Sequence, residues 1–143
     1  MSENMGIYRG KRKDTGEWVE GDLIESDNSH YPMVLIGHVI TSRDKHTNAL
    51  SFDGFDLCEV DPSTVGQFTG LLDKNGERIF ESDILLLDGE DGYFKLKFDE
   101  DTARFVMIGD IIQVDFDNFY SIEVEVVGNI HDNPELLEVS END

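Results

Sequence analysis

Apolar residues occur along the chain in short stretches rich in Val, Ile, Phe and Tyr, which end at Gly, Asp or Asn turns. Some of these stretches alternate between apolar and polar positions, as in YFKLKF at residues 93–98, where Phe94, Leu96 and Phe98 share one side. No stretch follows the 3.6-residue period of a long helix. The pattern predicts a mainly β fold built from hairpins, with at most one or two short helical turns.

Three features of the N-terminal part add detail to this prediction. YPMVLIGHVI, at residues 31–40, is continuously apolar and predicts a strand covered on both sides. The following residues 41–56 are polar and rich in turn formers, and we expect them to form a loop. Trp18 is the single tryptophan, and we expect it to anchor the core.

A short phrase occurs twice, as KDTGEWVEGDLI at residues 13–24 and GLLDKNGERIFESDIL at residues 70–85. Each copy predicts a hairpin turn followed by a tight corner, Glu20-Gly21-Asp22 in the first and Glu81-Ser82-Asp83 in the second. The short side chain of an aspartate can bond to backbone amides of its own corner. We therefore interpret the phrase as architecture rather than as a catalytic signature.

The repetition predicts two β lobes packed as one compact unit. The first comprises residues 1–60, including the polar loop 41–56, and the second comprises residues 61–137, followed by a flexible tail at 138–143. At the junction, Asp61 followed by Pro62 predicts a short helical turn. An aspartate side chain can accept hydrogen bonds from the exposed amides at a helix start, and proline, which has no N–H, loses no hydrogen bond at the first helical position.

Charge is distributed very unevenly. The chain carries 32 acidic and 11 basic residues, a net charge of -21, and residues 51–143 contribute -19 of it with 24 acids and 5 bases. Such a surface repels phosphate backbones, so we expect no direct nucleic-acid binding and predict a basic protein as the partner. The candidate binding surface consists of Asp88, Glu90, Asp91, Asp99, Glu100, Asp101, Asp115 and Asp117.

The sequence offers no feature of a membrane or disulfide-stabilised protein. No apolar run reaches the roughly 20 residues of a membrane span, and the first residues lack a secretory apolar stretch. The single cysteine, Cys58, lies in an alternating stretch and is interpreted as an inert apolar side chain. We therefore expect a cytoplasmic protein.

Several segments resemble the YopX family of bacteriophage and prophage proteins. They are TGEWVEGDL, VDPSTVGQFTGLLDKNGERIFESDIL and VVGNIHDNPELL, and the similarity extends from Tyr8 to Leu137. The resemblance implies a phage-encoded protein in the bacterial host cell, with SH3-like barrel-type lobes. It provides no catalytic residues, because the family has no assigned biochemical role. The sequence departs from the family at Ser82, where glycine is usual, and a positive φ would be strained there.

Residue types that carry catalysis or bind metals do not form a recognisable pattern. His30, His38, His46 and His131 lack the spacing of zinc ligands, and the acidic clusters DGEDG and FDEDT do not match a calcium loop. No phosphate-binding glycine loop or nucleophile elbow is present in the sequence. We expect no enzyme activity, no cofactor and no metal.

Three classes of function remain open. The first is a non-enzymatic acidic protein that docks on a basic host or phage protein, with mimicry of DNA as its sharper version. The second is a structural homo-oligomer that associates through exposed hairpin edges. The third is an enzyme or small-ligand binder that uses a groove between the lobes, with a divalent metal ion held by Asp88, Glu90, Asp91, Asp99 or Asp101.

Overall fold

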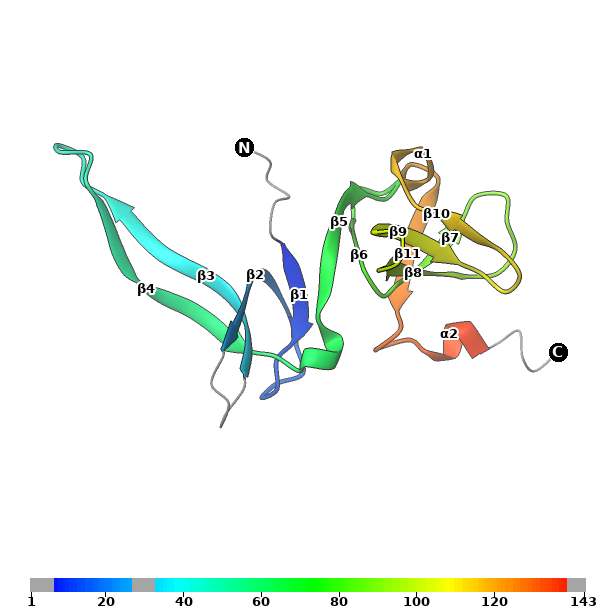
Figure 1. Cartoon of the computed structure of the whole chain (residues 1–143), viewed down its shortest axis with the longest axis horizontal. Helices are drawn as coiled ribbons and strands as arrows, with labels where there is room; N and C mark the ends of the chain where they lie inside the picture. Colours follow the sequence, from blue (N-terminus) through cyan, green and yellow to red (C-terminus); the bar gives the residue numbers. More distant parts are fainter. Residues whose placement is uncertain (1–6, 27–32, 139–143) are drawn as a thin grey trace. The chain divides into compact units, whose positions relative to one another are not determined.

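The computed structural model describes residues 7–26 and 33–138. Strands account for most of these residues and the helices are short, so the prediction of a mainly β fold is confirmed. The chain divides into two compact units, residues 1–65 and 66–143 (Figure 1). His30 and the tail beyond residue 138, about which the sequence made predictions, lie outside the described residues.

The first unit is an antiparallel sheet with the strand order β4-β3-β2-β1, in which neighbours along the chain are neighbours in space. A 3₁₀ helix, η1, follows the last strand. The elements are β1 (Tyr8–Lys11), β2 (Trp18–Ser26), β3 (Met33–Arg43), β4 (Leu50–Glu59) and η1 (Pro62–Thr64).

The junction predicted at Asp61-Pro62 forms as expected. The Asp61 side chain accepts a hydrogen bond from the Ser63 amide at 3.0 Å and caps η1. The helix belongs to the first unit rather than to the second lobe, where the sequence placed it. The reason is its attachment to β1, because the Lys11 amide donates to Thr64 Oγ1 at 2.9 Å and the Asp61 amide donates to the Lys11 carbonyl at 2.8 Å.

The core of the first unit is small. Ile36 and Val60 are its completely buried large apolar residues in the described part of the chain. Both pack on Gly10, where an added Cβ would lie 3.1 Å from each side chain. Close packing of these two side chains on β1 thus requires a residue without a side chain.

The prediction that Trp18 anchors the core is wrong, because its ring is only half-buried. Two cations of β1 lie over the ring, with the Arg9 guanidinium carbon 4.7 Å and Lys11 Nζ 5.5 Å from its centroid. The negative face of an indole attracts such cations. Trp18 therefore lies under charged side chains and is not one of the fully buried core residues.

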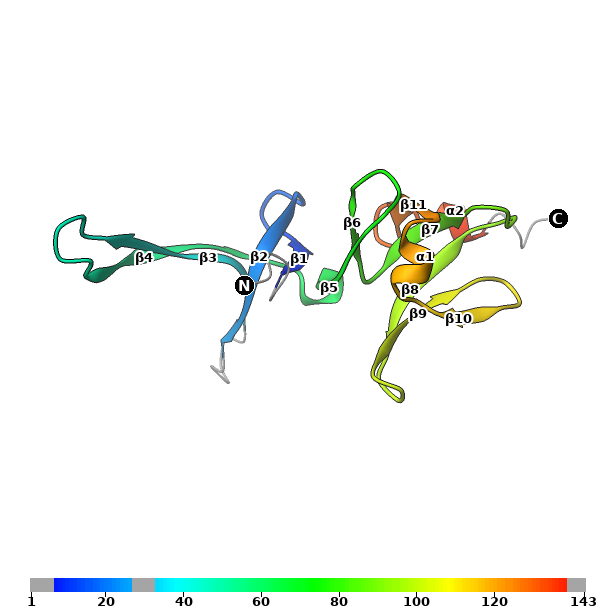
Figure 2. The same cartoon turned by 90° about the horizontal axis from the view of Figure 1, so that it is seen from above.

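Strands β3 and β4 form a long hairpin that we call the arm. The predicted polar loop 41–56 is wrong, since β3 continues to Arg43 and β4 begins at Leu50. The two strands pair from Leu35–Glu59 to Arg43–Leu50, with one bulge between these ends. Backbone pairing thus determines the structure here despite the polar composition. Beyond Gly37 the arm extends past its pairing with β2, as both views show (Figures 1 and 2). The apolar stretch expected to be covered on both sides is therefore exposed from His38 onward.

The second unit contains the hairpin of β5 and β6 and a five-stranded antiparallel sheet with the order β10-β9-β8-β7-β11. In the described residues this sheet does not close into a barrel, because β10 and β11 remain its edges. The elements are β5 (Gly66–Leu72), β6 (Arg78–Phe80), β7 (Asp83–Leu87), β8 (Phe94–Asp99), β9 (Arg104–Ile108), β10 (Gln113–Asp115), α1 (Asn118–Ser121), β11 (Val124–Asn129) and α2 (Glu135–Glu138).

The core of this unit is larger and draws on most of its strands. Phe94 and Leu96 face inward as the alternation predicts, whereas Phe98 is half-buried and contacts Phe105 with 5.2 Å between ring centroids. The buried apolar cluster consists of Ile79, Leu85, Phe94, Leu96, Met107, Phe116 and Val124.

The last strand begins later than the sequence indicates. The alternation of Ile122, Val124 and Val126 with polar residues would give a strand over residues 120–130 with Ile122 and Val124 on the same side. Instead, Asp117 caps the helical turn α1 by accepting from the Phe119 amide at 2.9 Å, and β11 starts at Val124. Ile122 is consequently 71% exposed while Val124 is buried.

Candidate functional site

The corner Glu81-Ser82-Asp83 connects β6 to β7 and organises the second unit. Asp83 is 1% exposed, and its carboxylate accepts a hydrogen bond from the Phe80 amide at 2.7 Å. The Ser82 amide donates to the Leu96 carbonyl at 2.8 Å, and the Ser82 carbonyl accepts from the Ile130 amide at 2.9 Å. Ser82 adopts φ 80°, so it keeps the conformation that suits glycine. Its backbone bonds join the corner to β8 and to the residue after β11.

The turn between β8 and β9 carries three consecutive acids. Asp99 accepts a hydrogen bond from the Asp101 amide at 3.0 Å, which fixes the start of the turn, and Ala103 closes it with φ 57°. Aspartate is favoured at such positions because its short side chain can bond to the amide two residues on. The local sequence thus places Asp99, Glu100 and Asp101 together.

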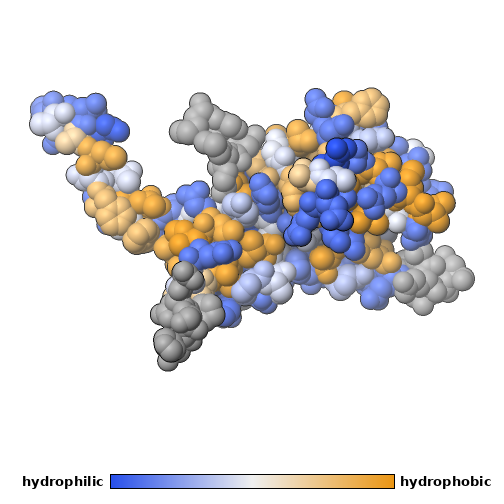
Figure 3. All heavy atoms as spheres, viewed as in Figure 1, coloured by the Kyte–Doolittle hydropathy of each residue, from blue (hydrophilic) through white to orange (hydrophobic). Residues whose placement is uncertain are grey.

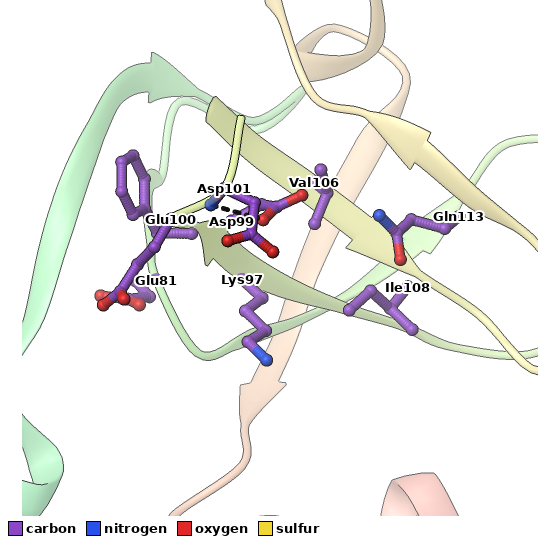
Figure 4. Close-up of a pocket in the computed structure, with 9 residues that line it drawn as sticks. Glu81, Lys97, Asp99, Glu100, Asp101, Val106, Ile108 and Gln113 are labelled. Carbon is purple, nitrogen blue, oxygen red and sulfur yellow. Dashed lines mark hydrogen bonds between the residues drawn. The ribbon is translucent and has the colours of Figure 1, made fainter. Parts of the chain in front are cut away.

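A groove with a volume of about 530 Å³ lies beside this turn. It joins residues from the corner, both strands of the β8–β9 hairpin and β10 (Figure 4). In this view the Glu81 and Glu100 carboxylates lie at the same edge of the groove. We call it the acidic groove, and its lining consists of Glu81, Lys97, Phe98, Asp99, Glu100, Asp101, Val106, Ile108 and Gln113.

The acidic groove combines charge with apolar surface. Four carboxylates and one ammonium group line it, which gives a formal charge of -3 at neutral pH. Phe98, Val106 and Ile108 supply its apolar part. A hollow of this kind can hold the aliphatic stem of a lysine or arginine while the carboxylates bind the charged end.

The eight predicted surface acids do not form a single cluster. Asp99, Glu100 and Asp101 line the acidic groove at the β8–β9 turn. Glu90 and Asp91 line a second hollow of about 450 Å³ next to Asp110, formed by the β7–β8 and β9–β10 turns. In an antiparallel meander these turns lie at the sheet end opposite to the β8–β9 turn.

The other predicted acids take part in local contacts. Asp88 forms an ion pair with Lys74 at 2.8 Å, and hydrogen bonding to that carboxylate raises the pKa of Lys74. Asp115 forms an ion pair with Arg104 at 2.7 Å, and Asp117 caps α1. Their charges are thus partly balanced or used by the fold.

Glu81 is the acidic residue of the groove that the sequence did not assign to the candidate binding surface. It was interpreted only as part of a corner, because nothing in the linear order connects it with residues 99–101. The pairing of β8 with both β7 and β9 brings the two segments together. Among residues 7–26 and 33–138, no group of three or more His, Cys, Asp or Glu is placed to hold a metal ion.

Helices that could cross a membrane do not occur in the described part of the chain. No curated protein matches the sequence. A similar solved structure is the crystal structure of protein EF1440 from Enterococcus faecalis, with 26% identity and a TM-score of 0.61. The similarity covers 92% of this chain and 97% of that one. The family described as YopX protein matches residues 7–138, and the chain therefore belongs to the YopX family.

Proposed function

We propose that this YopX-family chain is a non-enzymatic phage or prophage protein whose acidic groove docks on a basic surface of a host or phage protein. The observation that carries the proposal is that Glu81, Asp99, Glu100 and Asp101 line one groove together with apolar side chains. A basic partner side chain would find both a counter-charge and a surface for its aliphatic stem there.

The charge of the whole chain supports a basic partner. With a net charge of -21, the protein would attract a basic surface from a distance and raise the rate of encounter. Salt screens such attraction over roughly 10 Å at 0.1 M ionic strength. The proposal therefore requires that association becomes slower as salt is added.

The most buried carboxylates in the described part of the chain serve the fold rather than recognition. Asp73 and Asp83 are 5% and 1% exposed, and both accept hydrogen bonds from backbone amides. A general acid or base must reach its substrate's proton, which these two groups cannot do while they hold the fold together. The acids left on the surface are suited to recognition.

The test begins with capture of partners from host and phage-infected lysate at low and high salt. The binding constant of the captured protein is then measured for the wild type and for the variant E81Q/D99N/E100Q/D101N. We expect at least a tenfold loss of affinity, because four attractive charges are removed while side-chain shape is kept. The matched control is D88N/E90Q/D91N/D110N, which neutralises four acids outside the groove.

Equal losses in both variants, or binding that does not respond to salt, would contradict the groove as the docking site. Addition of duplex DNA decides between two versions of the proposal. Displacement of the captured protein by DNA would support mimicry of DNA, whereas indifference to DNA would indicate a basic partner that recognises the groove itself.

A further inference from the structure

One face of the arm displays four large apolar side chains. The register pairs Val39 with Phe55, Thr41 with Phe52 and Arg43 with Leu50, and alternate residues of a strand share a face. Val39, Leu50, Phe52 and Phe55 are 46%, 64%, 59% and 60% exposed. We call these four residues the arm stripe, and Figure 3 shows hydrophobic surface along the arm behind a hydrophilic tip.

A β-bulge in the arm gathers the two aromatic rings. The register shifts between Ile40, which pairs with Gly54, and Thr41, which pairs with Phe52. Asp53 is the additional residue of β4, and it allows Phe52 and Phe55 to lie on the same face. Their ring centroids are 5.0 Å apart in an edge-to-face arrangement.

The opposite face of the arm is mostly polar. It carries the pairs His38–Asp56 and Ser42–Ser51, and Ile40 is its exposed apolar residue. A two-stranded ribbon is at best marginally stable in water on its own. A contiguous exposed apolar stripe on such a ribbon marks an interaction surface.

Opposite charges flank the arm stripe on its own face. Arg43 lies at the tip end, paired with Leu50, and Glu59 lies at the base end, paired with Leu35. Val39 is midway between Leu35 and Arg43, roughly 13 Å from each along the strand. The face thus has an apolar centre, a cation at one end and, at the other, a carboxylate that also pairs with Lys13 at 3.1 Å.

We infer that the arm stripe binds the arm stripe of a second copy of this chain. A two-fold axis through the Val39–Phe55 pair would stack the two faces with their tips in opposite directions. Arg43 of each copy would then meet Glu59 of the other, so the contact is self-complementary, as two-fold association requires. The aromatic pair would pack at the centre of the contact.

The charge distribution agrees with a second copy as the occupant. Residues 33–59 contain four acids and two bases, a net charge of -2, whereas the whole chain carries -21. Two copies would therefore repel each other strongly through their acidic parts and only weakly through their arms. The arm is the region where two such chains can approach closely.

The area of the arm stripe limits how tightly two copies can bind each other. Side chains of this kind that are about half exposed offer on the order of 100 Å² each, so two stripes would bury roughly 800 Å². Stable complexes bury about 1,200–2,000 Å². The dimer should therefore be weak and depend on concentration.

Sedimentation velocity of the full chain, from roughly 1 µM to 1 mM, tests the inference. We expect a shift from monomer to dimer across this range, and a higher dimer fraction at about 0.15 M salt than at about 0.01 M, because salt screens the repulsion. F52T/F55T should raise the dissociation constant at least tenfold. The control I40T changes the opposite face and should leave it within about twofold.

A charge exchange tests the antiparallel arrangement separately. R43E and E59R should each weaken the dimer, and the double variant R43E/E59R should recover most of the loss. Melting temperatures of all variants identify those that fail to fold, since Glu59 also forms an ion pair with Lys13. A monomer at every concentration, equal effects of F52T/F55T and I40T, or no recovery in the double variant would overturn the inference.

Discussion

The carboxylate of Asp73, in the turn between β5 and β6, accepts a hydrogen bond from the backbone amide of Val126 in β11 at 2.9 Å. Its other oxygen accepts from the amides of Asn75 and Glu77 at 2.8 and 2.9 Å. One buried side chain therefore shapes the hairpin turn and ties it to a strand 53 residues further along the chain. In the second unit, the repeated segment therefore has a structural role, because its Asp73 connects the β5–β6 turn to β11.

Replacement of Asp73 by alanine should strongly destabilise the fold. Three amides would lose a charged acceptor, and a hydrogen bond to a charged group contributes about 1.5–3 kcal/mol. We expect a loss of at least about 3 kcal/mol in the free energy of unfolding, measured by urea denaturation. The control Glu90→Ala, in an exposed turn, should change it by less than about 0.5 kcal/mol. Similar values for the two variants would contradict this role of Asp73.

Ser82→Gly should stabilise the protein. Ser82 has φ 80°, a region that costs a residue with a Cβ about 1–2 kcal/mol, and glycine's greater freedom in the unfolded chain offsets part of the gain. We expect a net increase of about 0.5–1 kcal/mol, visible as a higher melting temperature. Ser121→Gly, in the helical turn α1, should have the opposite sign because glycine is a poor helix former. A lower melting temperature for Ser82→Gly would show that strain is absent at the corner.

Arg9→Gln should weaken the packing around Trp18. The guanidinium lies 4.7 Å from the indole centroid, and such a contact contributes about 0.5–1 kcal/mol at a partly exposed site. Since Trp18 is the single tryptophan of the chain, its fluorescence should become more accessible to iodide quenching in this variant. Arg43→Gln, at the arm tip, provides a control that should leave the quenching unchanged.

Acidification should loosen the tip of the arm. Hydrogen bonds from the Thr47 and His46 amides, at 2.8 and 2.7 Å, hold the pKa of Asp44 below its usual value. A lowered pKa means that the ionised carboxylate contributes stability above the unfolded pKa of about 3.9 and loses it as the pH falls through the lower folded pKa. NMR titration should show the Asp44 carboxyl shift and both amide shifts changing with one midpoint below that of an unstructured aspartate.

The variant Asp44→Asn serves as the reference for this titration, because its amide oxygen can still accept but cannot ionise. The amide signals of His46 and Thr47 should then lose their shared midpoint. A wild-type midpoint at or above the usual aspartate value would contradict the contribution of these two hydrogen bonds.

Local chemistry allowed the sequence to predict part of the fold correctly. The alternation at residues 93–98 identified the inward positions of Phe94 and Leu96, and Asp61 with Pro62 located η1. The arm could not be predicted in the same way, because its strand pairing satisfies the backbone whether or not the side chains are polar. Trp18 was misjudged since hydrophobicity alone does not show that two cations cover its ring.

The candidate site shows a similar division. Three consecutive acids at residues 99–101 were recognisable because they lie in one turn. Glu81 joins them only through the order of the strands, and Asp88 and Asp115 are partly neutralised by Lys74 and Arg104, which lie 14 and 11 residues away in the sequence. Contacts of this kind depend on register, which composition does not reveal.

The bulge in β4 also determines which face of the arm is apolar, because it changes on which side each later residue of the strand lies. Phe52 and Phe55 are three positions apart, and an odd separation in a regular strand would place their rings on opposite faces. Without the bulge, each face of the arm would carry one of the two rings, and neither face would be distinctly apolar. A hydropathy plot of the sequence would be the same in both cases. The side chains provide the apolar atoms, but the one additional residue in β4 gives the arm one apolar face and one mostly polar face.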